Sequence, residues 1–312
     1  MGGCARFDRI LRGMQLFSSR VAGRFFACLV LLVFAGFDGA VARAEDAGVS
    51  LTPAVIEVGS PELIRVNAPA SAKVDGEWFG RKLEFFWGRG SAAWFALAGV
   101  DVEAPAGPST LKIHETSAGV VRDRSITVEV GPAHYKTGSL SVAPNFVSPG
   151  AEELSRIKAD QEVKAKVFAV SAAEPLWSSD FRAPVAAEAT DSFGTRRTFN
   201  GKLASVHKGM DFRAAKGTPV RAGNGGVVVL ARPLYYEGNC VVVDHGLGLF
   251  TISMHFSRID VQEGQQVAAG EQLGLSGATG RVTGPHLHWA VRWQGAYLDP
   301  AKLLKLDLSS VR

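Results

Sequence analysis

Short apolar runs, separated by Gly, Pro, Asn and Asp, dominate the chain from about residue 48 onward. In residues 45–133 they include the runs at 63–66, 83–87, 93–97 and 125–130. Alternation of apolar and polar positions is the pattern of half-buried strands, and turn residues between short strands are typical of antiparallel sandwiches. The pattern predicts a small β-sandwich-like domain at residues 45–133.

Residues 134–185 read as a connector that contains one helix. Between residues 151 and 168, the apolar side chains at 154, 157, 163 and 167–168 fall on one helical stripe, and acids come early while lysines come late. Pro175 and Pro184 mark irregular chain after this segment. The pattern predicts an amphipathic helix that packs on a neighbouring domain.

Strand patterns return in residues 186–312. The runs lie at 218–222, 226–231, 239–244, 250–254, 272–276 and 287–293. The short gaps between them leave no room for crossover helices, so the strands are expected to pair antiparallel. The predicted fold class is therefore mainly all-β, with an antiparallel domain at 186–312 preceded by the smaller β domain and the connecting helix.

The first 44 residues have the composition of a secretory signal peptide. Arginines occupy the start, an apolar run of about eleven residues begins at Phe25, and Ala42-Arg43-Ala44 gives an A-x-A cleavage pattern. This run is short for a membrane span, which needs roughly 20 residues, so an uncleaved anchor is the alternative. We expect export across the inner membrane to the periplasm or cell envelope, with membrane contact confined to the signal peptide.

Charge and cysteine content refine this picture. The six arginines and two aspartates of residues 1–44 account for the whole +4 charge of the chain, so the mature part is neutral. The basic balance is then no sign of a nucleic-acid partner, and we expect none. Cys4 and Cys28 leave with the signal segment, and Cys240 alone cannot form an internal disulfide. Its place in the apolar run 240–243 predicts a buried small side chain.

Two histidines, His286 and His288, stand two residues apart just before the run that ends at Val291. On a strand, residues i and i+2 point to the same face, so both imidazoles project together while Leu287 and Trp289 face the other way. Such a pair suits a metal site or a general base beside one. The pair gains weight only if further ligands lie elsewhere in the chain.

His207 and Asp211 are the further ligands that the sequence offers. An extended chain separates residues i and i+4 by roughly 13 Å, whereas metal–ligand bonds are about 2 Å, so the chain must bend between them, and Gly209 is placed for that bend. Together the two motifs supply two histidine ligands, one carboxylate and a spare histidine. Three protein ligands with an open position for water form the catalytic zinc arrangement. We therefore expect one zinc ion per chain.

These motifs and four further phrases resemble the lysostaphin/LytM-type zinc endopeptidases, which cut peptidoglycan cross-bridges. The matching phrases lie at 193–197, 207–211, 217–220, 238–246, 254–257 and 277–289, in order within roughly 191–303. The N-terminal β domain and the helix resemble periplasmic members of this family more loosely. The resemblance implies a LytM-type β fold for the second domain, a zinc cofactor and peptidoglycan stem peptides as substrate.

The resemblance also assigns roles to five residues. It implies that zinc is held by His207, Asp211 and His288. It implies that His286 and His255 are the histidines that do not bind the metal but orient the water, take its proton and stabilise the developing oxyanion. His286 suits the general base because it shares a strand face with a ligand.

Outside these five positions the resemblance is less complete. Arg196 and Arg197 are candidates for the substrate groove or for binding a substrate carboxylate, and a surface salt bridge is the alternative. A tyrosine common in the family is Ser253 here, and a common leucine is Phe256. These departures leave the metal site intact and bear on substrate preference.

The predicted function is that of a zinc metalloendopeptidase, a peptidoglycan hydrolase. The first alternative is a catalytically inactive relative that binds peptidoglycan or activates another cell-wall hydrolase, but such proteins lose ligands or histidines and all five positions are filled here. Residues 264–271 also resemble lipoyl or biotinyl carrier hairpins, yet no lysine lies between 264 and 276. The N-terminal domain is expected to serve in positioning or to bind an envelope protein partner.

Overall fold

The computed structural model describes residues 48–201 and 203–311. The predicted signal peptide lies outside these residues. Strands far outnumber helices among the described residues, so the predicted mainly all-β class is confirmed. Helices are few: α1 (Ala151–Val167), α2 (Pro300–Leu303) and the 3-10 turns η1 (Pro144–Phe146) and η2 (Ser309–Val311). Within the described residues, no helix combines the length and the apolar character that crossing a bilayer would require.

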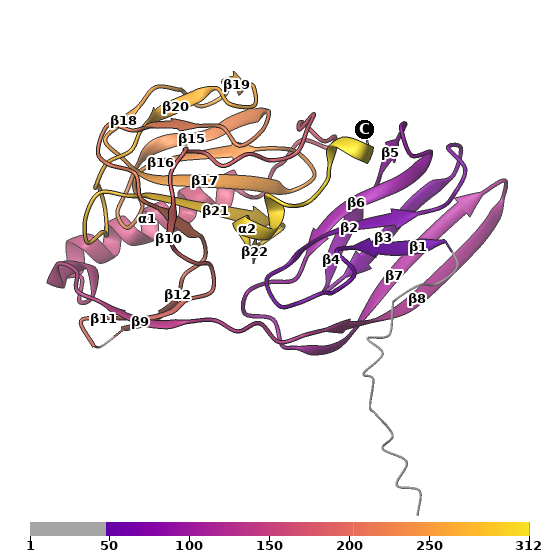
Figure 1. Cartoon of the computed structure of the whole chain (residues 1–312), viewed down its shortest axis with the longest axis horizontal. Coiled ribbons are helices and arrows are strands. Elements are labelled where there is room, and N and C mark those ends of the chain that lie inside the picture. Colours follow the sequence, from indigo (N-terminus) through magenta and orange to yellow (C-terminus); the bar gives the residue numbers. More distant parts are fainter. Residues whose placement is uncertain (1–47, 202, 312) are drawn as a thin grey trace, which may run out of the picture. The chain divides into compact units, whose positions relative to one another are not determined.

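Residues 48–131 contain two four-stranded antiparallel sheets (Figure 1). One has the order β1 (Val49–Thr52), β2 (Pro61–Val66), β6 (Ala93–Gly99) and β5 (Phe86–Gly88). The other has the order β4 (Arg81–Glu84), β3 (Lys73–Trp78), β7 (Gly107–Ser117) and β8 (Val120–Val130). Buried side chains from both sheets, such as Ile64 and Leu111, belong to one hydrophobic core, as expected of a sandwich.

The run predicted at 83–87 is not a single strand. It divides at Phe85 into β4 and β5, which belong to different sheets. Leu83 and Phe86 are both buried although they are three residues apart, which breaks the period of two. The chain changes sheets between them, and this lets both side chains reach the common core.

The second β region is built on one large antiparallel sheet. Its order is β10 (Ala189–Asp191), β13 (Met210–Phe212), β21 (Leu287–Trp293), β17 (Leu249–Phe256), β16 (Gly238–Asp244), β15 (Gly226–Leu234) and β19 (Gln266–Val267), with β22 (Ala296–Leu298) beside β21. A smaller antiparallel sheet has the order β14 (Pro219–Arg221), β20 (Gln272–Leu275) and β18 (Arg258–Ile259). The predicted antiparallel pairing is therefore confirmed in both sheets.

One strand of the connector departs from the antiparallel rule. Strand β9 (Thr137–Leu140) runs parallel to β11 (Arg196–Phe199), which in turn pairs antiparallel with β12 (Leu203–Val206). A parallel pair needs a long connection between its two strands. Residues 141–195, which include α1, provide this connection. The connector is thereby joined to the β11–β12 hairpin.

The predicted helix is present as α1, but only its second half packs. Val163, Val167 and Phe168 lie against a buried cluster on the large sheet that includes Leu230. Leu154, on the same predicted stripe, is 55% exposed. The first half of the helix thus leaves its apolar side chain in solvent, which the periodicity could not reveal.

A buried carboxyl group marks the N-terminal core. Glu62 is 0% exposed, and the Ser60 hydroxyl donates to its Oε1 at 2.5 Å. Its Oε2 has no hydrogen-bond partner among the described residues. Burial raises the pKa of Glu62 to about 8, against the smaller opposing effects of the Ser60 hydrogen bond and the Lys302 charge. The group is therefore protonated in the folded protein at neutral pH.

This carboxyl group makes stability depend on pH. Between the unfolded pKa of 4.5 and the folded pKa of about 8, the unfolded chain binds fewer protons, so the free energy of unfolding falls as pH rises. We predict that Glu62→Gln reduces this pH-dependent loss of unfolding free energy. The change in the free energy of unfolding relative to pH 4 should differ from that of the parent by on the order of a few kcal/mol at pH 9. Urea unfolding across this range measures it, with the exposed Glu84→Gln as control. Equal pH slopes in the parent and Glu62→Gln would contradict the prediction.

Candidate active site

The three predicted metal ligands meet where β13 pairs with β21. In this register Asp211 lies directly opposite His288. The chain bends after His207, so that its Nε2 lies 3.1 Å from Oδ1 of Asp211, and the predicted bend is confirmed. A Cβ at Gly209 would lie 2.4 Å from Nε2 of His288 and 2.7 Å from the Trp289 carbonyl oxygen. The φ of Gly209 is not left-handed, so its backbone conformation does not require glycine. Glycine is needed because only a residue without a Cβ allows this close approach.

Three atoms that could bind a metal ion, one from each candidate ligand, lie close together where β13 pairs with β21. Nδ1 of His288 lies 3.0 Å from Nε2 of His207 and 2.9 Å from Oδ1 of Asp211. Ligands about 2 Å from a tetrahedral ion are separated by about 3.3 Å, close to this spacing. A carboxylate and two imidazole nitrogens hold at most two protons among them, so hydrogen bonds alone cannot serve all three contacts. The donor set fits a zinc ion.

The side chain of Arg197 contacts two of the three candidate ligands, Asp211 and His207. Its Nη2 donates to Oδ2 of Asp211 at 2.7 Å and also to Asp191. The same atom lies 2.9 Å from Nδ1 of His207, which is also 3.0 Å from the Ser192 carbonyl oxygen. Because a guanidinium only donates, it binds the carboxylates while Nδ1–H of His207 donates to Ser192. Nε2 of His207 then keeps its lone pair for a metal.

His255 and His286 lie beside this cluster with matching tautomers. Nδ1 of His255 donates to the Thr279 carbonyl at 2.8 Å, and Nδ1 of His286 donates to the Gly284 carbonyl at 2.8 Å. Their ring centroids are 4.9 Å apart, and Nε2 of His286 lies 3.8 Å from Oδ1 of Asp211. With Nδ1 as the donor, the neutral form of each ring has its lone pair at Nε2.

Burial and the short contacts set the charges of the cluster. Burial alone would raise the pKa of Asp211, but the close imidazoles of His207 and His288 hold it well below its ordinary range. Burial lowers the pKa of His288. Burial, together with the charges that His288 and His286 would carry, lowers the pKa of His255 to about 3. An ionised carboxylate and neutral imidazoles are the forms that bind a divalent cation.

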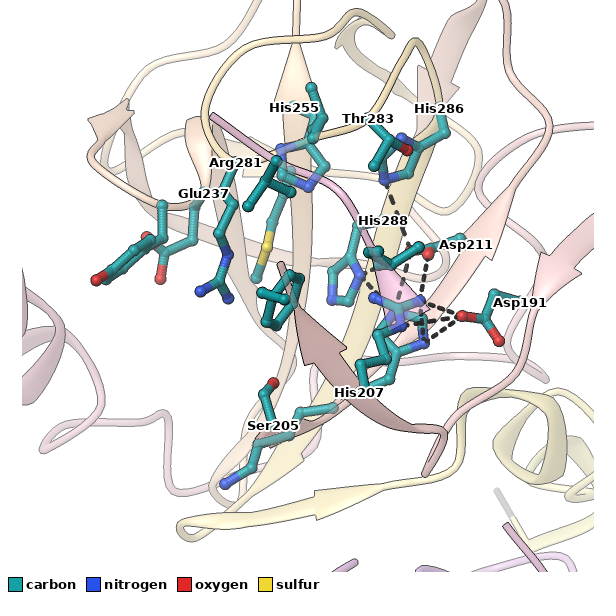
Figure 2. A pocket seen from close by; sticks show the side chains of 18 of the residues that line it. Asp191, Ser205, His207, Asp211, Glu237, His255, Arg281, Thr283, His286 and His288 are labelled. Atoms are coloured by element: carbon teal, nitrogen blue, oxygen red, sulfur yellow. Dashed lines mark hydrogen bonds and ion pairs between the residues drawn. The ribbon is translucent and has the colours of Figure 1, made fainter. Parts of the chain in front are cut away.

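A cleft of about 710 Å³ opens over these side chains. It is lined by all five residues predicted as ligands or catalytic histidines, and Figure 2 shows them facing one another. The prediction for the His-x-His pair is confirmed, since His286 and His288 line the cleft while Leu287 and Trp289 are 0% and 1% exposed.

The cleft also contains residues that the sequence reasoning missed. They include Asp191, Tyr236, Glu237 and Arg281, together with Leu140 and Val142 of the connector. Most of them lie in turns and irregular chain, where side-chain direction follows no fixed period. Arg281 alone lies within one of the phrases that carried the family resemblance, which was the available signal.

The predicted arginines have different surroundings. Arg197 contacts the ligand cluster, as described above, and is largely buried. Arg196 is exposed and lines a neighbouring pocket of about 540 Å³. Their role toward substrate stays a prediction.

Two further residues of this domain, His245 and Cys240, are structural. His245 is 0% exposed, and its ring nitrogens lie 2.7 Å from the Gly225 carbonyl oxygen and 2.8 Å from the Thr251 hydroxyl. Cys240 is buried and free, as predicted. Neither residue faces the cleft.

Comparison with known proteins identifies this region. The model of peptidase family M23 matches residues 205–300, which include all three donor residues. These residues form a peptidase M23 domain. The family predicted from the motifs is thus confirmed.

The M23 domain is similar to curated relatives. It is 46% identical over 101 residues to the peptidoglycan DD-endopeptidase ShyA of Vibrio cholerae, covering 32% of this chain and 24% of ShyA. It is 40% identical over 98 residues to the DD-carboxypeptidase/endopeptidase Mpg of Neisseria meningitidis, covering 31% of this chain and 23% of Mpg. The chain thus spans about a quarter of the length of these relatives.

A solved structure matches more of the chain. It is a peptidase M23 from Pseudomonas aeruginosa with a TM-score of 0.63 and 27% identity, and the match covers 80% of this chain and 94% of that one. A match of this extent includes residues outside the M23 domain. The antiparallel fold and an N-terminal β region are therefore shared with that protein.

The close approach at Gly209 gives a test of the ligand geometry. We predict that Gly209→Ala lowers zinc content per folded chain several-fold, because the added Cβ displaces His288 or the backbone of β21. Elemental analysis after dialysis at limiting zinc measures this. Gly131→Ala is the control, since its nearest atom would be 3.4 Å away. Full zinc occupancy in folded Gly209→Ala would show that His288 is not a ligand in this position.

Proposed function

We propose that the protein is a zinc-dependent peptidoglycan DD-endopeptidase. The supporting observation is the convergence of three donor atoms within 2.9–3.1 Å of one another, beside two imidazoles, in the cleft of an M23 domain. Relatives with this domain are named peptidoglycan DD-endopeptidases. The proposed substrate is the amide that joins two D-centres in cross-linked stem peptides.

The metal would be held by three atoms: Nε2 of His207, Oδ1 of Asp211 and Nδ1 of His288. When bound, zinc supplies Lewis-acid activation of water and of the amide carbonyl. Arg197 donates a hydrogen bond to Oδ2 of Asp211 and so fixes the orientation of this carboxylate. Such support of a ligand by an outer partner is typical of zinc sites.

His286 would act as general base. Its Nδ1–H is held by the Gly284 carbonyl, so Nε2 faces the cleft with a free lone pair that accepts a proton from the attacking water. The same proton then passes to the amide nitrogen as the C–N bond breaks, which gives a carboxylic acid and an amine. The acid then transfers its proton to the amine, leaving a carboxylate and an ammonium group. His255, kept neutral by burial, orients the water by accepting its second hydrogen at Nε2.

These roles separate catalysis from metal binding. We predict that His286→Ala and His255→Ala each lower the rate of cross-link cleavage by about 10²–10⁴-fold while zinc stays bound, because neither residue supplies a ligand atom. Asp211→Ala should lose both zinc and activity. Mass spectrometry of muropeptides released from purified peptidoglycan, with elemental analysis of each variant, measures both effects.

His114→Ala is the matched control, since this histidine is exposed on β7 and binds Asp123, outside the cleft. A parent protein that releases no more product than its His variants or a chelated sample would refute the endopeptidase. A binding protein or an activator of another hydrolase would then be the better description.

We propose further that the protein is exported and acts on peptidoglycan in the periplasm or cell envelope. The support is the composition of residues 1–44, with its basic start, short apolar run and A-x-A pattern. N-terminal sequencing of protein from the cell envelope should give a start near Glu45. Recovery of a chain that retains Phe25 would indicate an anchor instead.

A further inference from the structure

Arg281 is a cation of the cleft that lacks an acidic partner among the described residues. The other charged residues that line the cleft all have one: Glu103 binds Lys208, Glu237 binds Lys164, and Arg197 binds Asp191 and Asp211. The described residues give the Arg281 side chain no hydrogen bond to an acceptor and no salt bridge. Within the described part of the chain, the positive charge of Arg281 in the cleft is therefore not paired with an acid.

Two aromatic rings hold the guanidinium of Arg281 in place. Its Cζ lies 4.5 Å from the ring centroid of Phe199, on β11, and 4.6 Å from that of Tyr236, in the turn between β15 and β16. The backbone N–H of Arg281 also donates to the Tyr236 carbonyl at 2.9 Å. A guanidinium placed over aromatic rings is held by cation–π attraction, which uses none of its N–H groups as hydrogen-bond donors to an acceptor atom. Those N–H groups remain available to a planar acceptor.

The position of Arg281 connects it to the reaction site. Thr279, two residues earlier, provides the carbonyl that binds Nδ1 of His255, and the Glu237 carbonyl binds the His255 backbone N–H at 3.0 Å. Figure 2 shows Arg281 beside Glu237 on the His255 side of the cleft. Glu237 is the acid whose charge acts on Arg281, but Lys164 already binds it at 2.6 Å. A substrate anion would not have to displace an internal partner.

We propose that Arg281 binds a carboxylate of the cross-linked peptide and so selects substrates with a free carboxylate near the scissile amide. This inference rests on the proposed endopeptidase function. In a cross-link made through the D-centre of a diamino acid, the carbon that bears the scissile nitrogen also carries a carboxylate. The C-terminal D-alanine of the acceptor stem carries a second one. A guanidinium fork binds either in the same bidentate way.

Three synthetic cross-linked dimers distinguish the two carboxylates. One has both carboxylates free, one has the diamino-acid carboxylate converted to the carboxamide, and one has the terminal carboxylate converted. kcat/KM is measured on each for the parent, Arg281→Gln, Arg281→Lys and Arg213→Gln, the last being an exposed arginine outside the cleft. Zinc content and thermal unfolding check that each variant is folded and loaded.

The parent should cleave the free dimer about 10- to 100-fold faster than one of the two amides, as expected for a hydrogen bond between charged groups. Arg281→Gln should lose this preference, Arg281→Lys should keep part of it, and Arg213→Gln should keep all of it. The amide that is discriminated against identifies the carboxylate. A purely structural role in holding Phe199 and Tyr236 would slow all dimers alike and leave the ratio unchanged.

A parent that cleaves all three dimers equally overturns the role of Arg281 and leaves the endopeptidase intact. The same holds if Arg281→Gln keeps the parent's preference. A parent that cleaves none of the dimers, although zinc is bound, overturns the proposed function itself. Should Arg281→Gln fail to fold, the parent's preference and the response of Arg281→Lys still decide the question.

Discussion

The pairing of β13 with β21 is the constraint on which the site depends. It places Asp211 opposite His288, and because side chains on a strand alternate, a slip of one residue would turn one ligand away from the cleft. Met210, Phe212 and Leu287 are 6%, 3% and 0% exposed, so such a slip would also bring apolar side chains out of the core. The hydrophobic core and the metal geometry therefore demand the same register.

The rest of the cleft is held by elements far apart in sequence. Helix α1 binds the turn after β15 through two contacts. Asp160 accepts a hydrogen bond from the Tyr235 N–H at 2.6 Å, and Lys164 forms a salt bridge with Glu237 at 2.6 Å. The carbonyl of Glu237 in turn holds the backbone of His255, a non-glycine residue with a φ of 69°. Such a backbone conformation is costly and persists where surrounding contacts fix it. The connector thus contributes to the position of a histidine that we propose to be catalytic.

Contacts from the N-terminal β region reach the same cleft. Glu103, in the loop after β6, binds Lys208, the neighbour of His207, at 2.5 Å. Leu140 and Val142 of the connector line the cleft as well. The site is therefore completed by segments outside the M23 domain, and this fits the similarity to a solved peptidase M23 that extends over most of the chain.

Local patterns in the sequence were enough for most strands, the helix and four of the five central residues, while His255 was implied only by the family resemblance. Alternation predicted the large sheet, and the His-x-His and His-x-x-x-Asp spacings, read with Gly209, predicted which side chains would meet. These features depend on neighbours one to four residues away, so the chain itself encodes them. Local alternation did not predict the division of the 83–87 run at Phe85, because the chain changes sheets there.

Tertiary structure decided the features that join distant segments. The parallel pairing of β9 with β11, the exposure of Leu154 and the stacking of Arg281 between Phe199 and Tyr236 have no periodic signal. Each depends on which surface another segment covers, and that is fixed only when the sheets and the connector pack. The sequence by itself determined the candidate ligands and the strand pattern around them. Packing determined what surrounds the ligands, because charge pairing and burial are properties of the assembled cleft.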